Sequence, residues 1–238
     1  MKIEKQTYCK LNGYQLKLIA VITMLIDHIG AVLLGDHGSL PDGGDSVITA
    51  LYYLCRMVGR LAFPLFCFLL TEGFFYSKNR YRYVGRMMVF AVVSLWPFYI
   101  AFDSYGNVLI TFTIALLTMV LIEAVRNRMR ENQKIFLIIV IGGIGYLFAE
   151  LLHSDYGGIG VVAILLLYFF HAHPILSYVI SVVFLGTFLD SSVYIALVGA
   201  IFLYSYNGER GEQTKYFFYF FYPIHLVLLV IIKWYLLS

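Results

Sequence analysis

The stretch MLIDHIGAVLL, residues 24–34, is an apolar run with an aspartate and a histidine side by side in its middle. It belongs to a longer apolar segment, about 16–35, which is long enough to cross a hydrocarbon core of roughly 30 Å as a helix. A charged side chain at that depth costs at least a few kcal/mol, so Asp27 and His28 are expected to face the interior of a helical bundle. The stretch therefore predicts a membrane protein with an intramembrane polar site.

The composition extends this prediction to the whole chain. Of its 238 residues 61% are hydrophobic and 13% are charged, and the mean hydropathy is +0.82. Soluble domains carry about 25% charged residues. No polar interval exceeds about a dozen residues, so no separate soluble domain is expected. We predict one all-α domain over residues 1–238, a polytopic transmembrane helical bundle.

The apolar runs indicate about nine spans, within a range of eight to ten. They are expected at about 16–35, 48–76, 84–102, 108–126, 134–151, 158–172, 175–189, 192–206 and 216–236. The seventh and eighth runs are short, which suggests tilted, half-crossing or interior helices.

Basic residues fall into alternate loops, which predicts the orientation. The clusters are Lys2, Lys5, Lys10 and Lys17; Lys78, Arg80, Arg82 and Arg86; Arg126, Arg128, Arg130 and Lys134; and Arg210 with Lys215. The intervening loops carry acidic residues instead, namely Asp36, Asp42, Asp45, Asp103, Asp155 and Asp190. Short cytoplasmic loops collect Lys and Arg. We therefore expect a multi-pass protein of the bacterial cytoplasmic membrane with a cytoplasmic amino terminus and, after nine spans, an external carboxyl terminus.

Two arginines are expected to share the layer of Asp27 and His28. At about 1.5 Å per residue, His28 lies roughly 18 Å into the first span, and Arg56 and Arg60 lie roughly 12 and 18 Å into the antiparallel second span. An ion pair between Asp27 and an arginine would keep both charged. Adjacent helical residues point about 100° apart, so Asp27 is expected to brace a neighbouring helix while His28 remains available as a proton acceptor.

Other polar residues offer weaker signals. Glu72, near the cytoplasmic end of the second span, could pair locally with Lys78, Arg80 and Arg82 or shape a ligand mouth. The segment YNGERG, residues 206–211, reads as a tight turn that presents Asn207, Arg210 and backbone N–H groups to phosphate, with Lys215 close by.

Histidines and cysteines elsewhere fit structural roles. A lone histidine on an apolar helix, such as His225, is more often a packed core residue than a catalyst. His171 and His173 have no third ligand nearby in sequence, so no metal site is expected. The cysteines have no CxxC spacing and read as reduced packing residues. No nucleic-acid motif is present, so no nucleic-acid partner is expected.

Several segments together resemble the TraX family in order along nearly the whole chain. They include IAVITMLIDHIGAVLL (19–34), YNGERG (206–211) and KYFFYFFYPIHLVLL (215–229). The most specific motifs are M-x-x-D-H-I-G, G-R-x-A-F-P and F-Y-P-x-H-L. The family's residues correspond here to Asp27, His28, Arg60, Glu72, Asn107, Arg210 and His225.

The resemblance implies an acetyltransferase that draws acetyl-CoA from the cytoplasm, as membrane-embedded acyltransferases do. It implies as acceptor a peptide amino terminus such as that of pilin, or another peptide, glycan or lipid. For such a transfer, His28 is the candidate base, and Arg56 or Arg60 is the candidate group that stabilises the oxyanion. Arg80, Arg82, Arg210 and Lys215 are candidate partners for the phosphates of coenzyme A.

Two other functions stay open from the residues alone. The layer of Asp27, His28, Arg56 and Arg60 could relay protons in a transporter or channel. Alternatively, the same residues could only fix how the helices pack in a non-enzymatic membrane scaffold. The sequence leaves the oligomeric state open.

Overall fold

Every apolar run expected from the sequence is helical in the computed structural model, which describes residues 10–35, 46–129, 131–212 and 216–237. The helices are α1 (Gly13–Ile29), continued by a π-helical turn (Gly30–Leu34), α2 (Ser46–Gly59), α3 (Ala62–Tyr76), α4 (Arg80–Val93), α5 (Leu95–Phe102), α6 (Val108–Arg128), α7 (Glu131–Leu151), α8 (Gly157–Phe169), α9 (Pro174–Phe188), a 3-10 helix (Ser191–Val198), α10 (Gly199–Tyr204) and α11 (Phe217–Leu237). No strand is assigned within these ranges.

Asparagine side chains define where three of the helices begin. Asn12 and Gln15 form a capping box at the start of α1, in which each side chain accepts from the other's backbone N–H. Asn79 accepts from the N–H of Arg82 at the start of α4, and Asn107 caps α6 in the same way. These contacts satisfy N–H groups that the first turn of a helix leaves without an intrahelical partner.

Fewer helices than expected have the length of a membrane span. Five described segments are long and apolar enough, and α4 with α5 makes a sixth if this pair, bent by 43°, is one span. The apolar helices Gly157–Phe169, Pro174–Phe188 and Ser191–Tyr204 are shorter. At about 1.5 Å per residue they fall short of a core of roughly 30 Å. The count of nine is thus not matched, and the orientation derived from it stays a prediction.

The second span is broken beside its arginines. α2 ends at Gly59 and α3 begins at Ala62, with Arg60 and Leu61 in a turn between them. The break begins four residues before Pro64. That position follows from the chemistry of proline, whose ring collides with the carbonyl of the residue four positions earlier in a continuous helix.

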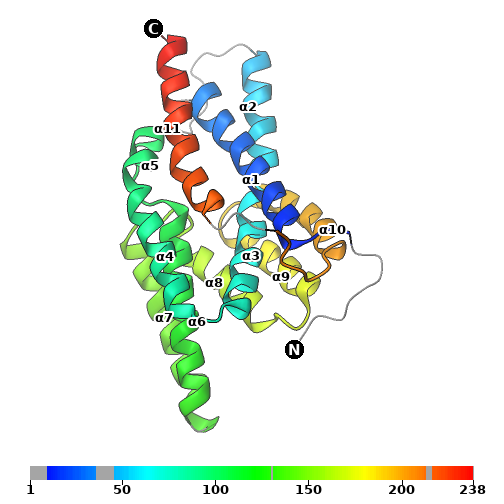
Figure 1. Cartoon of the computed structure of the whole chain (residues 1–238), viewed down its shortest axis with the longest axis vertical. Helices are drawn as coiled ribbons and strands as arrows, with labels where there is room; N and C mark the ends of the chain where they lie inside the picture. Colours follow the sequence, from blue (N-terminus) through cyan, green and yellow to red (C-terminus); the bar gives the residue numbers. More distant parts are fainter. Residues whose placement is uncertain (1–9, 36–45, 130, 213–215, 238) are drawn as a thin grey trace.

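The helices form two groups that meet at this break (Figure 1). α1, α2 and α11 stand together in the upper half of the view, and α6 to α9 form the lower half, with α3 continuing downward from α2. α1 packs against α2, α3 and α11, while α8 packs against α6, α7 and α9. Arg60, which lies in the break, is therefore placed where the two groups meet.

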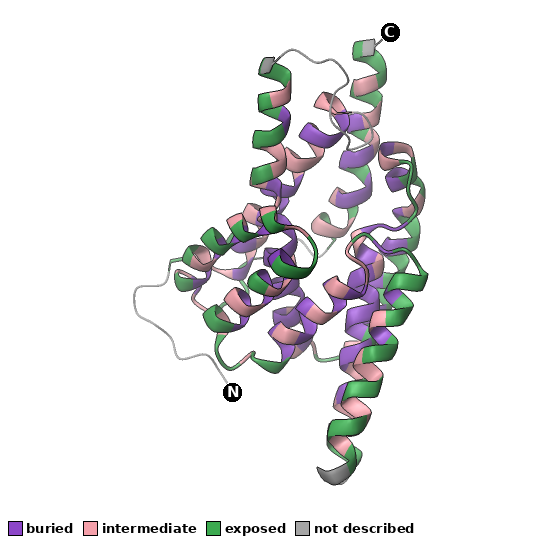
Figure 2. Cartoon of the chain, turned by 180° about the vertical axis from the view of Figure 1, so that it is seen from behind, coloured by how far each residue is buried: buried purple, intermediate pink, exposed green. Residues whose placement is uncertain are grey.

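Burial follows this arrangement (Figure 2). Buried residues gather on the helices of the interior, including Leu16, Leu65 and Leu116, which have no exposed surface. α7 is different, because only 11% of its apolar window is buried and it exposes large side chains such as Phe136 and Leu147. Exposed apolar surface of this kind is what contact with lipid requires.

Candidate functional site

Asp27 and Arg56 form the ion pair expected between the first two spans. Nη1 of Arg56 donates to Oδ2 of Asp27 at 2.7 Å, and both side chains are about one-fifth exposed (24% and 18%). The helices can approach here because Gly59 faces Asp27, and a Cβ at this position would collide with the carboxylate. Oδ1 of Asp27 is buried and has no hydrogen-bond partner within the described part of the chain. Asp27 thus braces α2, as its direction on the helix predicted.

Arg60 has a partner that sequence reasoning did not anticipate. Its Nη2 donates to Oδ2 of Asp190 at 2.6 Å, and its Nε donates to the hydroxyl of Ser192 at 2.8 Å. Hydrogen bonds from the Ser192 hydroxyl and backbone N–H, reinforced by the charge of Arg60, hold the pKa of Asp190 below its usual value. The turn before the 3-10 helix is thereby tied to the break between α2 and α3.

His28 lies against a second histidine, His225 of α11. Nδ1 of His28 and Nε2 of His225 are 2.7 Å apart, and the two ring planes differ by 4°. Nδ1 of His225 lies 2.8 Å from the carbonyl oxygen of Phe221. Phe102 and Tyr222 pack edge-on against the His28 ring. The structure therefore brings together two of the residues implied by the family resemblance.

The contacts of this pair determine where its protons lie. A carbonyl oxygen only accepts, so Nδ1 of His225 carries a proton, and Nε2 of a neutral His225 ring is an acceptor. The neighbouring Nδ1 of His28 must then donate to it. Nε2 of His28 is left with a lone pair, and no hydrogen bond to it is recorded among the described residues. His28 is thus held in the tautomer that a general base requires.

Asp155 adds a third carboxylate, which sequence reasoning used only as a mark of topology. It follows α7 in an exposed turn, and its charge interacts with those of Asp27, Arg56 and Arg60. Desolvation by the surrounding protein, followed by the negative charge of Asp27, raises the pKa of Asp155 to about 7. Asp155 therefore lies within electrostatic range of the polar layer.

Glu72 does not pair with the basic loop that follows it, so that expectation was wrong. Its Oε1 is 2.6 Å from Nε2 of His171, in the turn between α8 and α9, and its Oε2 accepts from the hydroxyl of Tyr206 at 3.2 Å. Burial raises the pKa of Tyr206, which keeps this hydroxyl a donor. The reason for the different pairing is that Glu72 is 4% exposed and points into the bundle.

The 206–211 loop forms the glycine turn predicted from its sequence. Gly208 and Gly211 have φ angles of 72° and 71°, and the Asn207 side chain accepts from the N–H of Glu209 at 2.9 Å. The backbone of this loop pairs with the start of α1, because the N–H of Asn207 donates to Leu11. Arg210 is exposed on it. Lys215 lies outside the described residues.

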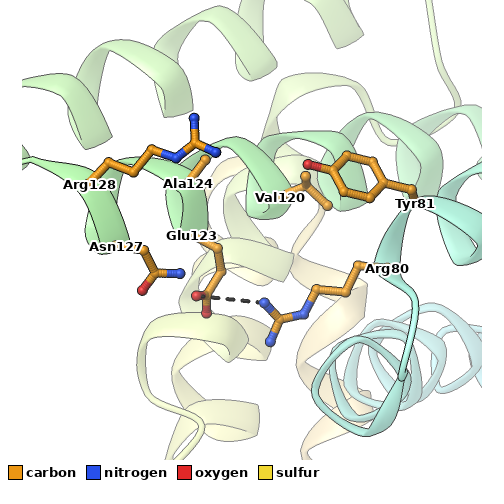
Figure 3. Close-up of a pocket in the computed structure, with 7 residues that line it drawn as sticks. All are labelled: Arg80, Tyr81, Val120, Glu123, Ala124, Asn127 and Arg128. Atoms are coloured by element: carbon orange, nitrogen blue, oxygen red, sulfur yellow. Dashed lines mark ion pairs between the residues drawn. The ribbon is translucent and has the colours of Figure 1, made fainter.

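Arg80 lies in a separate pocket of about 220 Å³ between α4 and α6 (Figure 3). The pocket is lined by Arg80, Tyr81, Val120, Glu123, Ala124, Asn127 and Arg128. Nη1 of Arg80 is 3.6 Å from Glu123, and its guanidinium lies 4.4 Å from the centre of the Phe74 ring. Arg82 is exposed, and its backbone N–H is used by the cap of α4.

Asn107 has a structural role, because it links two helices. It is fully buried, its amide donates to the carbonyl of Ala91 at 3.0 Å, and its oxygen accepts from the N–H of Leu109 at 3.0 Å. Its contacts join α4 to α6. Among the described residues, no group of three His, Cys, Asp or Glu side chains could hold a metal ion.

Comparison with known proteins places the chain in a family. The model of the TraX protein family matches residues 12–233. The probable fimbrial assembly protein FimC, serogroup H1, of Dichelobacter nodosus is 32% identical over 259 aligned residues, which cover 94% of this chain and 97% of that protein. No solved structure matches significantly. The family match spans both the histidine pair and the ion pairs of the polar layer, and the chain belongs to the TraX family.

Proposed function

We propose that this protein is a membrane-embedded acetyltransferase that moves an acetyl group from cytoplasmic acetyl-CoA to an acceptor at or across the bacterial cytoplasmic membrane. Membership of the TraX family and the name of its fimbrial relative favour a pilin-type subunit as the acceptor. The observation that carries the proposal is the histidine pair, in which Nε2 of His28 has a lone pair and no recorded partner among the described residues.

The chemistry needs a base at the acceptor. Nε2 of His28 takes the proton of the acceptor amine or hydroxyl as the acceptor atom bonds to the acetyl carbon. The carbon–sulfur bond of the thioester breaks, and the coenzyme A thiolate leaves with that proton. His225 holds the His28 ring in the required tautomer throughout, as carboxylates do for histidines in other acyltransferring sites.

The arginines of the layer are suited to the negative charge that develops on the carbonyl oxygen. Arg56 uses one recorded N–H to hold Asp27, and Arg60 uses two to hold Asp190 and Ser192. A guanidinium has five N–H donors, so each arginine retains donors that can point at an oxyanion. Their carboxylate partners keep them in place.

Acetyl-CoA, the acetyl donor, would bind with its phosphates away from the layer that contains His28 and the two arginines. Glu72 lies twelve positions after Arg60, or roughly 18 Å along a helix, beside the 206–211 loop that carries Asn207 and Arg210. Acetyl-CoA carries its thioester at the end of a long flexible arm, so its phosphates and its reacting carbon can occupy levels this far apart. Arg80, Arg82 and Lys215 stay candidates for the same phosphates.

Acetyl transfer by the purified protein in detergent tests the proposal. With radiolabelled acetyl-CoA and a peptide that has a free amino terminus, the wild type should label the peptide, and His28→Ala should abolish labelling. His173→Ala, which removes an exposed histidine outside the layer, is the matched control. Elution as the same monodisperse species would verify folding. Absence of labelling by the wild type, together with no binding of coenzyme A in calorimetry, would overturn the proposal.

A further inference from the structure

A basic pocket lies where α4 begins and α6 ends (Figure 3). The first residue of α4, Arg80, and the last residue of α6, Arg128, both line it, and the two helices pack against each other. Its volume is about 220 Å³. A water molecule takes up about 30 Å³ of the liquid, so the pocket has room for a group several times larger. Among the described residues, its lining includes neither the 206–211 loop nor the histidine pair, so it is separate from the site proposed for acetyl transfer.

The acidic side chain of the pocket already has partners within the protein. Nη1 of Arg80 lies 3.6 Å from Oε2 of Glu123, and the hydroxyl of Tyr168 donates to Oε1 of Glu123 at 3.1 Å. Nη1 of Arg126 donates in turn to this hydroxyl at 3.2 Å. The charge of Glu123 is thus balanced by Arg80, and each of its oxygens faces a donor. Glu123 therefore does not prevent an anion from binding in the rest of the pocket.

Arg128 supplies a positive charge that no acid of the pocket balances. The lining contains two guanidiniums and one carboxylate, and Arg80 faces that carboxylate. Within the described ranges, no ion pair or hydrogen bond is recorded for the side chains of Arg128 and Asn127. Figure 3 shows the Arg128 side chain extending along α6 toward Ala124, one helical turn earlier. A guanidinium has parallel N–H donors that match two oxygens of a phosphate, so the pocket is suited to a phosphate group.

The pocket adjoins an exposed apolar surface. On both helices its face continues into exposed apolar side chains, namely Met88 and Val92 of α4 and Leu117 and Leu121 of α6. Steps of three or four positions connect these residues to those that line the pocket, and such steps stay on one side of a helix. Tyr81, which lines the pocket, is 74% exposed, and tyrosines are enriched where a membrane meets water. The pocket therefore lies at the polar end of a surface suited to lipid.

We propose that this pocket binds the phosphate group of an anionic phospholipid, whose acyl chains lie along the exposed faces of α4 and α6. The phosphate supplies the negative charge that balances Arg128, and the chains cover the apolar side chains that follow Tyr81 along α4. Basic pockets between membrane helices bind the head groups of anionic lipids in this way. A zwitterionic lipid is disfavoured, because its ammonium group brings a further positive charge toward Arg80 and Arg128. The inference does not depend on acetyl transfer.

Native mass spectrometry tests the proposal, because it resolves the first lipid bound to a membrane protein. The full-length protein, freed of lipid in detergent, is titrated with phosphatidylglycerol or with phosphatidylcholine. We expect the wild type to bind phosphatidylglycerol about tenfold more tightly. Arg128→Gln should remove most of this preference, and Arg128→Lys, which keeps the charge but not the parallel donors, should retain part of it. Arg86→Gln is the matched control, because Arg86 is an exposed arginine of α4 outside the pocket lining.

Three outcomes would overturn the proposal. The first is equal affinity of the wild type for the two lipids, and the second is an unchanged preference in Arg128→Gln. The third is an equal loss in Arg86→Gln, because net charge and not the pocket would then control binding. Coenzyme A is added as a competitor, since its phosphates offer the same chemistry without acyl chains. Displacement of phosphatidylglycerol by coenzyme A would assign the pocket to that cofactor and refute the lipid, whereas continued lipid binding that depends on Arg128 would support the lipid whether or not the preparation transfers acetyl groups.

Discussion

Replacing His225 tests the tautomer argument most directly. His225→Phe keeps an aromatic ring to stack on Phe221 and removes the acceptor for Nδ1 of His28, which is 2.7 Å away in the wild type. His225→Gln removes the ring and offers an amide oxygen in place of Nε2. The two variants therefore separate packing from hydrogen bonding.

The size of the effect follows from the lost hydrogen bond. An unpaired donor in a partly buried site costs about 1–3 kcal/mol. If the loss of this hydrogen bond raises the activation free energy by the same amount, the rate falls by about 5- to 150-fold, since about 1.4 kcal/mol is tenfold. We expect His225→Phe to lower kcat for acetyl transfer by this factor with little change in KM, and His225→Gln to lower it by less than about tenfold.

Initial rates at saturating acetyl-CoA, measured on preparations that elute as one species, provide the assay. A wild-type kcat in His225→Phe would refute the reasoning, because His28 would then not need its neighbour. Equal losses in the two variants would refute it too, since the ring and not the acceptor would matter.

Three further predictions concern stability. Gly59→Ala should lower the free energy of unfolding by about 2–3 kcal/mol, because the new methyl group meets Asp27, whereas Gly85→Ala, where a Cβ inside α4 meets nothing, should be neutral or stabilising by up to about 1 kcal/mol in the same detergent melts. Glu72→Ala removes the acceptor that joins the turn after α8 to the loop after α10, and hydrogen exchange should accelerate in both segments; unchanged exchange would contradict this link. Because burial raises the pKa of Asp155 from 3.8 to about 7, the folded protein holds a proton there that the unfolded chain loses, so stability should fall as the pH rises through this window. Asp155→Asn should flatten that part of the curve, and an unchanged slope would show that another group titrates.

The contacts that could be predicted are those between consecutive elements. The Asp27–Arg56 pair followed from depth along two antiparallel helices, which are usually neighbours in space. The glycine turn at 206–211 followed from local residue preferences, because Gly208 and Gly211 adopt backbone angles that other residues disfavour.

Contacts between distant elements could not be predicted in this way. Arg60 and Asp190 are 130 positions apart, and His28 and His225 are 197 apart. Periodicity indicates which face of a helix is apolar but not which other helix covers it. The stacking of Tyr156 on Phe63, 93 positions apart, could not be predicted for the same reason.

The amino-acid sequence by itself determined that this is an all-helical membrane protein with polar residues at the depth of Asp27, because apolar length and the cost of buried charge depend only on local composition. The tertiary structure alone decided how many helices are long enough to span and which carboxylate each arginine holds. Those outcomes depend on where helix ends meet in space, and a buried polar group is satisfied by whichever partner the packing brings within hydrogen-bonding distance.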